Sequence, residues 1–472
     1  MRFGLIYELQ LPRPWDANSE HQLVQQALAE VEVADRLGLD YVWANEHHFL
    51  EEYSHNSAPE VFLAAAAART KQIHIGHAVV LSPPGYNAPA RVAERMSMLD
   101  LVSSGRAEWG TGSSASRAEL EGFGVDPAQK KLMWAEATEQ TANMMAMAPY
   151  PGFKGDYFSM PARNVIPKPL QKPHPPIWLA CSNRETIHVA ARNGVGALAF
   201  AFVDPADAAK WAGEYYDIIK SDECVPIGHS VNANIAMATG FSLHHDEAEA
   251  IKRGGEGFQF FGFALGHHYV YGEHVPGVTN VWERFERGRD KMPAAVGNGI
   301  GTPAQLIERL KQYQDSGVDQ VIFVQQAGRN THADIVASLE LFAAEVMPAL
   351  KADQAARDAR KQAELAPSIE AALKRKKWMQ PLAPEAIPSI PAYGRSVVAS
   401  DGTPKALAAR RGGGINIPSE DPSERSNAAE YATRPAQPRR PPSRLTARCL
   451  PAHSTGIHTA APRRFAQRRV FR

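Results

Sequence analysis

The chain has 472 residues, of which 44% are hydrophobic and 22% are charged. This composition supplies a large buried core and excludes collagen, a coiled coil and wholesale disorder. The length predicts two or three units, or one large α/β barrel with an appendix. Three scattered cysteines are too few for a disulfide framework or a thiolate metal site. Because the chain has no apolar run of 18 residues and no leader-like start, we expect a cytoplasmic protein that does not cross a membrane.

The formal net charge of zero conceals an uneven distribution of charge. Residues 401–472 carry 14 Lys and Arg against 5 Asp and Glu, so this segment is basic and the rest of the chain is acidic. Residues 380–472 are rich in proline and arginine and show little periodicity, so we expect them to be disordered. A basic tail can bind nucleic acid. A solvated tail is the simpler interpretation, and we expect no nucleic-acid partner.

Strand-like and helix-like segments alternate from the start of the chain to about residue 350. Several strands are short, continuous and apolar, which is typical of parallel strands buried on both faces. Eight alternations predict an α/β fold of the (β/α)8 TIM-barrel class. A doubly wound sheet is the alternative, but it would need a glycine-rich turn after its first strand, where this chain has none. The expected strands span residues 2–7, 39–44, 73–81, 106–110, 176–181, 196–202, 230–240 and 319–325.

Start and stop signals place three of the helices. Residues 19–37 carry apolar side chains at helical spacing and are followed by a glycine. Residues 303–316 begin after a threonine with proline at the first helical position, and a glycine follows them too. A last barrel helix is expected over residues 331–347, before a proline.

Two segments interrupt the regular spacing. Residues 149–175 are rich in proline and cross over to the fifth strand. Residues 253–300 form a long insertion between strands seven and eight, rich in glycine, histidine and aromatic residues, and loops of this length are usually functional or disordered. We therefore expect three parts: a barrel over residues 1–350, a charged helical extension over residues 351–379, and the basic tail over residues 380–472.

A barrel of this class holds its catalytic groups at the carboxyl ends of its strands. The second strand ends in Asn45-Glu46-His47-His48-Phe49. Two imidazoles beside a carboxylate suit proton transfer near neutral pH, so His47 and His48 are the candidate catalytic residues. A pair of packing or surface histidines is the simpler alternative.

The histidine spacing does not predict a metal site. A metal-dependent barrel offers two histidines separated by one residue, so that both rings face the lumen. His47 and His48 are adjacent and point to opposite sides of an extended chain. His74 and His77 are an odd number of residues apart and diverge in the same way. We therefore expect no metal.

Two neighbouring strand ends carry residues suited to an anion. The segment Gly110-Thr111-Gly112-Ser113-Ser114 offers backbone N–H groups and hydroxyls, although it is not a G-x-G-x-x-G motif. After the fifth strand, Ser182 or Asn183 is placed to cap a helix whose amino end favours an anion. Capping alone explains these two residues equally well. Together, the two turns suggest one phosphate held between them.

Several segments resemble the bacterial luciferase α chain and its flavin-dependent monooxygenase relatives. The resemblance covers about residues 1–350 and implies a (β/α)8 barrel with FMN at its carboxyl end. It also implies an activity in which reduced flavin traps O2 as a C4a-hydroperoxide that oxidises a small, apolar organic substrate. The matching segments are Glu46-His47-His48-Phe49, Ile75-Gly76-His77-Ala78-Val79, Leu99-Asp100, Ser104-Gly105-Arg106, Gly301-Thr302-Pro303, Gly317-Val318-Asp319 and Val346-Met347-Pro348.

The resemblance implies roles for individual residues. His47 matches a proton donor or acceptor beside the reactive edge of the flavin, and His48 is its neighbour. Ala78 and Val79 match a dipeptide with a cis bond, rare outside proline, that packs against the flavin ring. The insertion matches a mobile loop that closes the site. The implied cofactor-binding residues are Asn45, Ala78, Val79, Thr111, Gly112, Ser113, Ser182, Asn183 and Thr186.

The chain departs from the family at one point, because the α chain's cysteine–arginine pair aligns near Gly112-Ser113. Backbone N–H groups and hydroxyls would have to hold the phosphate instead. The implied partners are O2, a small-molecule substrate, a separate flavin reductase that supplies FMNH2, and a second subunit in a homo- or heterodimer.

Two other functions remain open at this point. One is an F420-dependent hydride-transfer enzyme of the same fold, which the Glu46-His47-His48 segment modestly disfavours. The other is a non-catalytic subunit like the luciferase β chain, which would not need His47. The aromatic residues of the insertion, Phe258 to Tyr271, suggest either an apolar pocket cover or the packing of an extra hairpin.

Overall fold

The computed structural model describes residues 1–292, 299–390, 396–398 and 404–406. The chain divides into two compact units, Met1–Ile390 and Pro391–Arg472, and the first contains the whole barrel. In the second unit, β14 (Ser396–Val398) pairs antiparallel with β15 (Pro404–Ala406). Most of the tail that we expect to be disordered lies outside the described residues.

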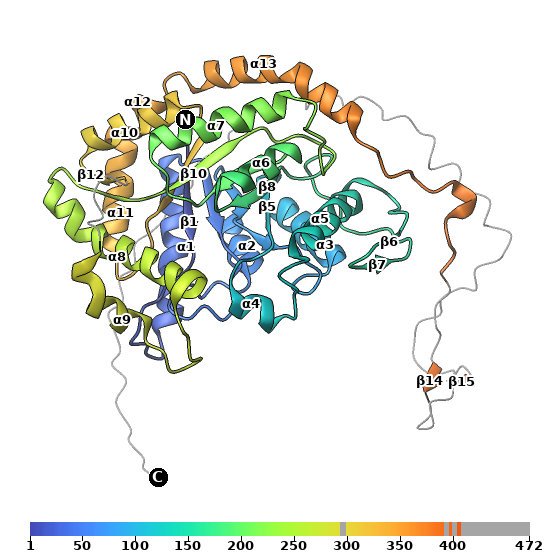
Figure 1. Ribbon diagram of the computed structural model, residues 1–472, viewed down its shortest axis with the longest axis horizontal. Helices are drawn as coiled ribbons and strands as arrows, with labels where there is room; N and C mark the ends of the chain where they lie inside the picture. Colours follow the sequence, from blue (N-terminus) through green and yellow to red (C-terminus); the bar gives the residue numbers. More distant parts are fainter. Residues whose placement is uncertain (293–298, 391–395, 399–403, 407–472) are drawn as a thin grey trace, which may run out of the picture. The chain divides into compact units, whose positions relative to one another are not determined.

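Eight parallel strands form a closed barrel, which confirms the predicted (β/α)8 fold (Figure 1). Each barrel strand pairs with the next one along the chain, and the last pairs with the first, so the barrel has no free edge. The barrel strands are β1 (Arg2–Tyr7), β2 (Tyr41–Ala44), β3 (His74–His77), β5 (Ala107–Gly112), β8 (Ile177–Cys181), β9 (Gly196–Ala199), β10 (Ile235–Gly240) and β13 (Gln320–Val324).

The third expected strand, residues 73–81, is divided in two. Its first part is β3, and its second part is β4 (Val80–Leu81), which pairs with the end of β5. The peptide bond between Ala78 and Val79, at the division, is cis.

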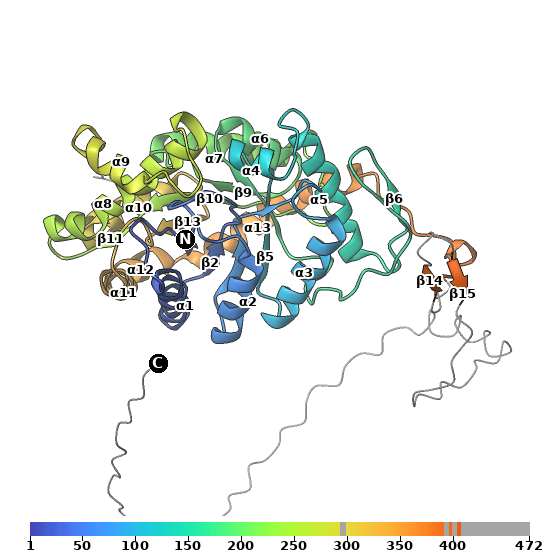
Figure 2. The same ribbon diagram turned by 90° about the horizontal axis from the view of Figure 1, so that it is seen from below.

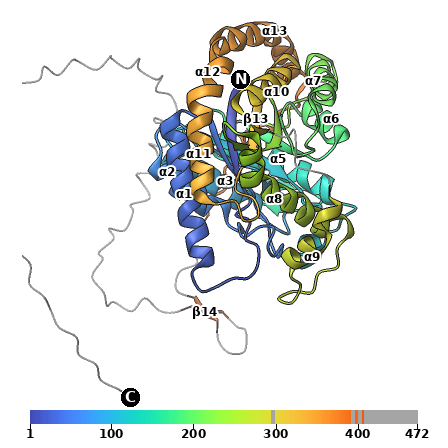
Figure 3. The same cartoon turned by 90° about the vertical axis from the view of Figure 1, so that its left-hand side faces the viewer.

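Helices follow the strands and cover the outside of the barrel. Helix α1 (Ser19–Leu37) has the predicted bounds and ends at Gly38, whose φ of +83° lies in the left-handed region that favours glycine. Figure 2 shows α1, α2 and α3 following one another around the barrel, and Figure 3 shows α11 beside α1. The other outer helices are α2 (Pro59–Arg69), α3 (Pro89–Val102), α5 (Lys130–Ala146), α6 (Arg184–Arg192), α7 (Pro205–Lys220), α10 (Pro303–Asp315) and α11 (His332–Leu341).

Apolar side chains form two layers of core. The larger layer lies between the strands and the outer helices and includes Leu5 and Val42. The neighbouring residues Ile6 and Trp43 point the other way and belong to a second cluster inside the barrel, as the two-residue period of a strand requires. This second cluster continues into Phe260 and the rest of the insertion. The insertion therefore packs onto the barrel interior by burying apolar surface.

The insertion lies where we expect it, but it is mainly helical, so the expectation of a long loop or an extra hairpin is wrong. Helix α8 (Glu247–Gly266) continues as a π-helical turn, η1 (His267–Tyr271). Helix α9 (Val281–Gly288) and a short turn, η2 (Arg289–Lys291), follow. Strands β11 (Ser242–Leu243) and β12 (Ile300–Gly301) bracket the insertion with a short parallel ladder.

Buried residues in α8 recur at alternating four- and three-residue spacings, as an amphipathic helix requires. Glycines occupy part of this stripe, and they hide its apolar character in the sequence. At Gly257 a Cβ atom would come within 2.3 Å of the backbone oxygen of Ala327, so the glycine allows the close approach of α8 to the segment after β13. The stripe consists of Ala250, Gly254, Gly257, Phe261 and Ala264.

The proline-rich crossing segment contains a short hairpin of β6 (Phe153–Lys154) and β7 (Ser159–Met160). A short helix, α4 (Arg117–Gly122), follows β5. After α11 come the turn η3 (Phe342–Val346), α12 (Met347–Lys351), α13 (Gln354–Arg375) and the turn η4 (Pro384–Ala386).

Helix α13 falls within the expected helical extension and packs at the amino end of the barrel (Figure 1). Asp358 pairs with Arg2 of β1 at 2.7 Å, and Lys361 pairs with Asp319, just before β13, at 2.5 Å. Among the described residues, no helix is long and apolar enough to cross a membrane.

Candidate active site at the carboxyl end of the barrel

The neighbouring ends of β1 and β2 bring Glu8 and His47 together. The Nε2 atom of His47 lies 3.4 Å from Oε2 of Glu8. Asn45 donates from Nδ2 to Oε1 of Glu8 at 2.6 Å, and the Tyr53 hydroxyl donates to the same oxygen at 3.3 Å. The Glu8 carboxylate is buried, so these two donors hold it against the imidazole ring.

A second carboxylate faces the other ring nitrogen of His47. The Nδ1 atom of His47 lies 3.1 Å from Oε1 of Glu119, a fully buried residue of α4. The same carboxylate accepts the N–H of His48 at 2.9 Å and the hydroxyl of Ser114 at 2.6 Å. His47 is therefore held between two buried carboxylates, with only 13% of its side chain exposed.

These contacts set the protonation state of the group. Burial lowers the pKa of His47, but the charges of Glu119 and Glu8 outweigh burial and raise this pKa to about 9. Burial acts to raise the pKa of Glu119, but the charge and hydrogen bond of His47 lower it overall. Burial raises the pKa of Glu8 to about 7, although His47 acts in the opposite direction. At neutral pH, the site therefore holds a protonated His47 that can donate a proton.

His48, the second candidate catalytic residue, lies in different surroundings. Its Nε2 atom is 3.1 Å from Oε1 of Glu46, and its ring packs against Phe123 with the centroids 4.8 Å apart. The Glu46 carboxylate also accepts the N–H of Leu81 at 2.8 Å and an amide N–H of Asn87 at 2.9 Å. The imidazole of His48 thus belongs to a network that ties the end of β2 to β4, whereas the backbone N–H of His48 donates to Glu119.

Ala78 and Val79 lie beside this group. The N–H of Ala78 donates to the backbone oxygen of Ala44 at 2.8 Å, and both Ala78 and Val79 belong to the apolar cluster inside the barrel. At Gly112 a Cβ atom would come within 2.5 Å of Cγ2 of Val79, so the glycine lets β5 approach the cis peptide. The structure thus gathers Asn45, Ala78, Val79 and Gly112 around the barrel mouth.

The predicted phosphate residues do not all have free groups. Thr111 is fully buried; its hydroxyl donates to the backbone oxygen of Trp178 at 2.8 Å and accepts from Nε1 of Trp134 at 3.0 Å. This hydroxyl is therefore bonded to the barrel wall, and a role of Thr111 in binding the phosphate stays a prediction. The side chain of Ser113, the next hydroxyl along the turn, is half-buried and reaches solvent.

The capping interpretation of the turn after β8 is confirmed. The side-chain oxygen of Asn183 accepts the N–H of Thr186 at 3.0 Å, and the hydroxyl of Thr186 accepts the N–H of Asn183 at 3.3 Å. The two residues therefore form a capping box at the start of α6. Ser182, before them, is exposed. Because β5 and β8 are paired, Ser113, Ser182 and the amino end of α6 lie at the same end of the barrel. This donor set fits an anionic phosphate.

Aromatic side chains of the insertion pack over His47. The hydroxyl of Tyr269, in η1, lies 3.3 Å from Nδ1 of His47. The ring of Tyr53 packs against those of Tyr269 and Phe261, with the centroids 6.1 and 5.7 Å apart. The insertion therefore places an aromatic roof over His47.

Sequence reasoning missed Glu8, Tyr53 and Glu119. Glu8 directly follows β1, beside the strand that carries His47, so the argument that selected His47 would also have found Glu8. Tyr53 belongs to the irregular loop between β2 and α2, and Glu119 reaches the site from α4 through the turn after β5. Neither of these positions has a spacing signal.

Comparison with known proteins places the chain in a family. The luciferase-like monooxygenase family matches residues 1–320, and the chain belongs to this family. The family includes flavin-dependent monooxygenases and F420-dependent oxidoreductases.

One flavin-dependent and one F420-dependent relative each align with most of this chain. The oxygenase component of the flavin-dependent trigonelline monooxygenase of Acinetobacter baylyi is 26% identical over 368 residues, which are 74% of this chain and 95% of that protein. The F420-dependent glucose-6-phosphate dehydrogenase of Amycolatopsis mediterranei is 24% identical over 345 residues, which are 71% of this chain and 97% of that protein. The crystal structure of the monooxygenase RslO1 from Streptomyces bottropensis shares the fold, with a TM-score of 0.60 and 24% identity over 74% of this chain and 99% of that one.

Proposed function

We propose that the protein is the oxygenase component of a two-component flavin-dependent monooxygenase. It uses reduced FMN from a separate flavin reductase, and O2, to oxidise a small apolar organic substrate. The observation that carries this proposal is His47, held protonated between Glu8 and Glu119 under an aromatic roof. The relative named as the oxygenase component of a flavin-dependent monooxygenase supports it.

The residues at the barrel mouth fit FMN. The cis peptide at Ala78 and Val79 belongs to an apolar wall against which the flat flavin ring would lie, with Asn45 nearby. The hydroxyls of Ser113 and Ser182, with the N–H groups at the amino end of α6, would hold the phosphate. When bound, reduced FMN would supply the electrons that O2 needs.

His47 and its neighbours manage protons and water at this site. Because the pKa of His47 is about 9, the imidazole holds a proton at neutral pH and can donate it to an oxygen atom in the mouth. Glu119 and Glu8 hold the ring in place and stabilise its charge. Burial keeps the pKa of the Tyr269 hydroxyl well above its ordinary value, so this hydroxyl stays neutral. The aromatic roof excludes water, which protects a reactive oxygen species.

An apolar substrate fits the aromatic rings beside the roof. Phe202 lies in the segment that follows β9, and its ring contacts Phe258 and Phe261 of α8, with the centroids 5.7 and 5.6 Å apart. Phe202 and Phe258 are only partly buried, so they offer an apolar surface at the mouth. We therefore assign the substrate to this side of the mouth.

An F420-dependent hydride transfer is the second candidate, because a relative that covers most of the chain uses F420. Under anaerobic conditions, the protein is mixed separately with photoreduced FMN and with reduced F420, and binding is measured by ultrafiltration. We expect reduced FMN to bind at least about tenfold more tightly, a difference of about 1.4 kcal/mol. Tighter binding of reduced F420 would transfer the assignment to hydride transfer.

A further inference from the structure

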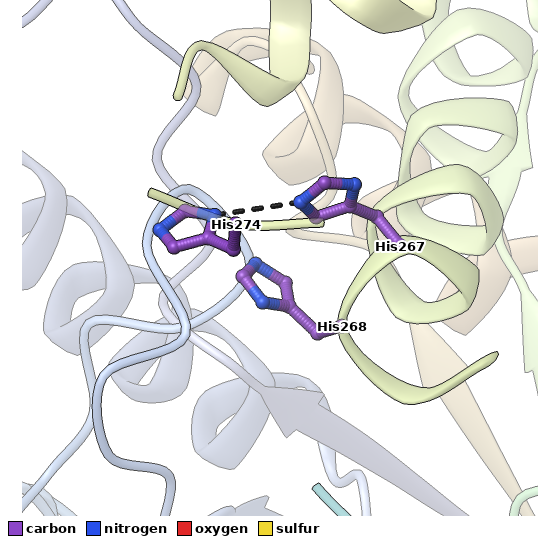
Figure 4. A group of neighbouring side chains, drawn as sticks. All are labelled: His267, His268 and His274. Carbon is purple, nitrogen blue, oxygen red and sulfur yellow. Dashed lines mark hydrogen bonds between the residues drawn. The ribbon is translucent and has the colours of Figure 1, made fainter. Parts of the chain in front are cut away.

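Three histidines of the insertion, in and just after η1, converge on one another (Figure 4). His267 and His268 are the first two residues of η1, and His274 follows that turn. Each offers one ring nitrogen, and the three nitrogens lie within 4.8 Å of one another. The sequence gives no sign of this group, because the spacing between His268 and His274 matches no usual ligand motif. The three rings come together because the chain folds back after η1.

The separation of two of the rings matches that of two ligands in a small metal site. The Nε2 atom of His267 lies 3.4 Å from Nδ1 of His274. Zinc binds imidazole nitrogen at about 2.0–2.1 Å in tetrahedral geometry, which separates two ligand nitrogens by about 3.4 Å. Three imidazoles with a fourth position open are also a common ligand set for this metal.

Neighbouring groups fix the rings from outside. The Nε2 atom of His268 donates to the backbone oxygen of Glu51 at 3.0 Å, and Nε2 of His274 lies 3.7 Å from the Glu51 carboxylate. A carboxylate or carbonyl on the far side of a ligand histidine is the usual outer contact of metal sites. At Gly272 a Cβ atom would come within 2.2 Å of Nδ1 of His267, so only glycine permits this approach.

We propose that His267, His268 and His274 bind one divalent transition-metal ion of the zinc type, which fixes η1 over the barrel mouth. Tyr269 is the next residue of η1, and its hydroxyl touches His47. Holding the two preceding residues on a metal ion therefore holds the roof tyrosine in place. The site binds its metal whether or not the barrel binds flavin, so this inference does not rest on the proposed function.

The test titrates the full-length protein, stripped of metal with a chelator, with Co²⁺ and then Zn²⁺. We expect one equivalent of Co²⁺ to produce the visible absorption bands of a low-coordinate nitrogen site, and Zn²⁺ to remove them. The variants His267→Ala and His274→Ala should lose at least about 100-fold in affinity. Zn²⁺ should raise the thermal midpoint of the parent protein and not those of the variants. The control His245→Ala removes an exposed histidine outside the cluster and should bind metal like the parent.

Two results would overturn the proposal. One is the absence of a saturable Co²⁺ equivalent in the parent. The other is parent-like metal binding in both alanine variants, which would place the metal on other histidines such as those of the tail. Should an alanine variant fail to fold by circular dichroism, His274→Gln replaces it, because the amide keeps a polar group at this position while removing the imidazole.

Discussion

His47 lies between two carboxylates that differ in their protonation. Glu119 accepts hydrogen bonds from Ser114 and from the backbone of His48 and stays ionised, whereas burial raises the pKa of Glu8 to about 7. Pairs of titratable groups whose surroundings separate their pKa values are typical of acid–base sites. The arrangement therefore supports the proposal that His47 donates a proton, with Glu119 as its counter-charge.

Removing that counter-charge should change the pH dependence of the reaction. In Glu119→Gln, the imidazolium loses the negative charge that offsets burial, so the pKa of His47 should fall from about 9 towards or below its ordinary value. If turnover needs a protonated His47, the alkaline fall of kcat should then begin at a pH at least about one unit lower than in the parent. The measurement is kcat against pH for both proteins with reduced FMN, O2 and substrate. An unchanged alkaline limb would contradict the role of Glu119.

The same pair should make stability depend on pH. The folded-state pKa of His47 is raised, so its stabilising contribution is fully present below the unfolded pKa of about 6.5. That contribution is lost as the pH rises through about 9. The thermal midpoint of the parent should therefore exceed that of Glu119→Gln by more at pH 7 than at pH 10. If the difference in thermal midpoint did not vary with pH, Glu119→Gln would destabilise the protein only through lost packing.

Replacement of His47 tests the residue directly. His47→Ala should reduce turnover strongly and change the affinity for reduced FMN by less than about tenfold, or about 1.4 kcal/mol. The reason is that, under the proposed function, this ring moves a proton and other residues hold the cofactor. His188→Ala is a matched control, because it removes a half-buried histidine that pairs with Glu214 on the outer helices. Turnover equal to the parent's in His47→Ala would remove this residue from the mechanism.

At the scale of elements, the irregular loop between β2 and α2 holds the insertion in place. Glu52 in this loop is fully buried and accepts the N–H groups of Val281 and Trp282, at 2.6 and 3.0 Å, at the start of α9. It also accepts the N–H of Arg13 at 2.9 Å. One carboxylate thus joins the loops after β1 and β2 to the helix that follows η1.

Loss of Glu52 should loosen the insertion. Glu52→Ala leaves three N–H groups without their acceptor and should lower the free energy of unfolding by about 2–4 kcal/mol. It should also speed proteolysis within the insertion, because α9 loses its connection to the barrel. The control Glu283→Ala changes an exposed carboxylate of the same helix and should alter stability by less than about 0.5 kcal/mol. Equal effects of the two substitutions would contradict the anchoring role.

The agreement between sequence and structure varies among elements for physical reasons. Strand β1 matches its expected bounds because a short apolar run defines it. Helix α1 matches its expected bounds because a regular helical period and a terminal glycine define it. The strand expected over residues 230–240 begins only at Ile235. Residues of the insertion looked loop-like because glycines share the buried stripe of α8 with phenylalanine and alanine. Of the site, the strand end with His47 was predictable, whereas the contact with Glu119 depends on how the turn after β5 folds.

At the scale of the whole molecule, α13 completes the amino end of the barrel. Its ion pairs with Arg2 and Asp319, and the buried side chains of Leu365 and Ala372, connect this helix to the first and last barrel strands and to the core. The compact unit accordingly extends to Ile390, well beyond the last barrel helix.

Two truncations separate α13 from the tail. A chain that ends at residue 390 should keep the thermal midpoint and the reduced-FMN affinity of the full protein, because the first compact unit is intact. A chain that ends at residue 352 loses α13 and its pairs, and its midpoint should fall by roughly 5 °C or more. Calorimetry of the three proteins gives both comparisons. A large loss of stability in the chain that ends at residue 390 would show that the tail contributes to the fold of the barrel unit.

The most direct test of the proposed activity is rapid mixing of the anaerobic complex of the protein and reduced FMN with O2-saturated buffer, followed by absorption spectroscopy. We expect a transient spectrum distinct from those of reduced and oxidised FMN. It should decay faster in the presence of an apolar substrate that becomes hydroxylated or otherwise oxygenated. Direct conversion of reduced to oxidised FMN at the rate of free flavin, with or without the protein, would contradict the proposed activity.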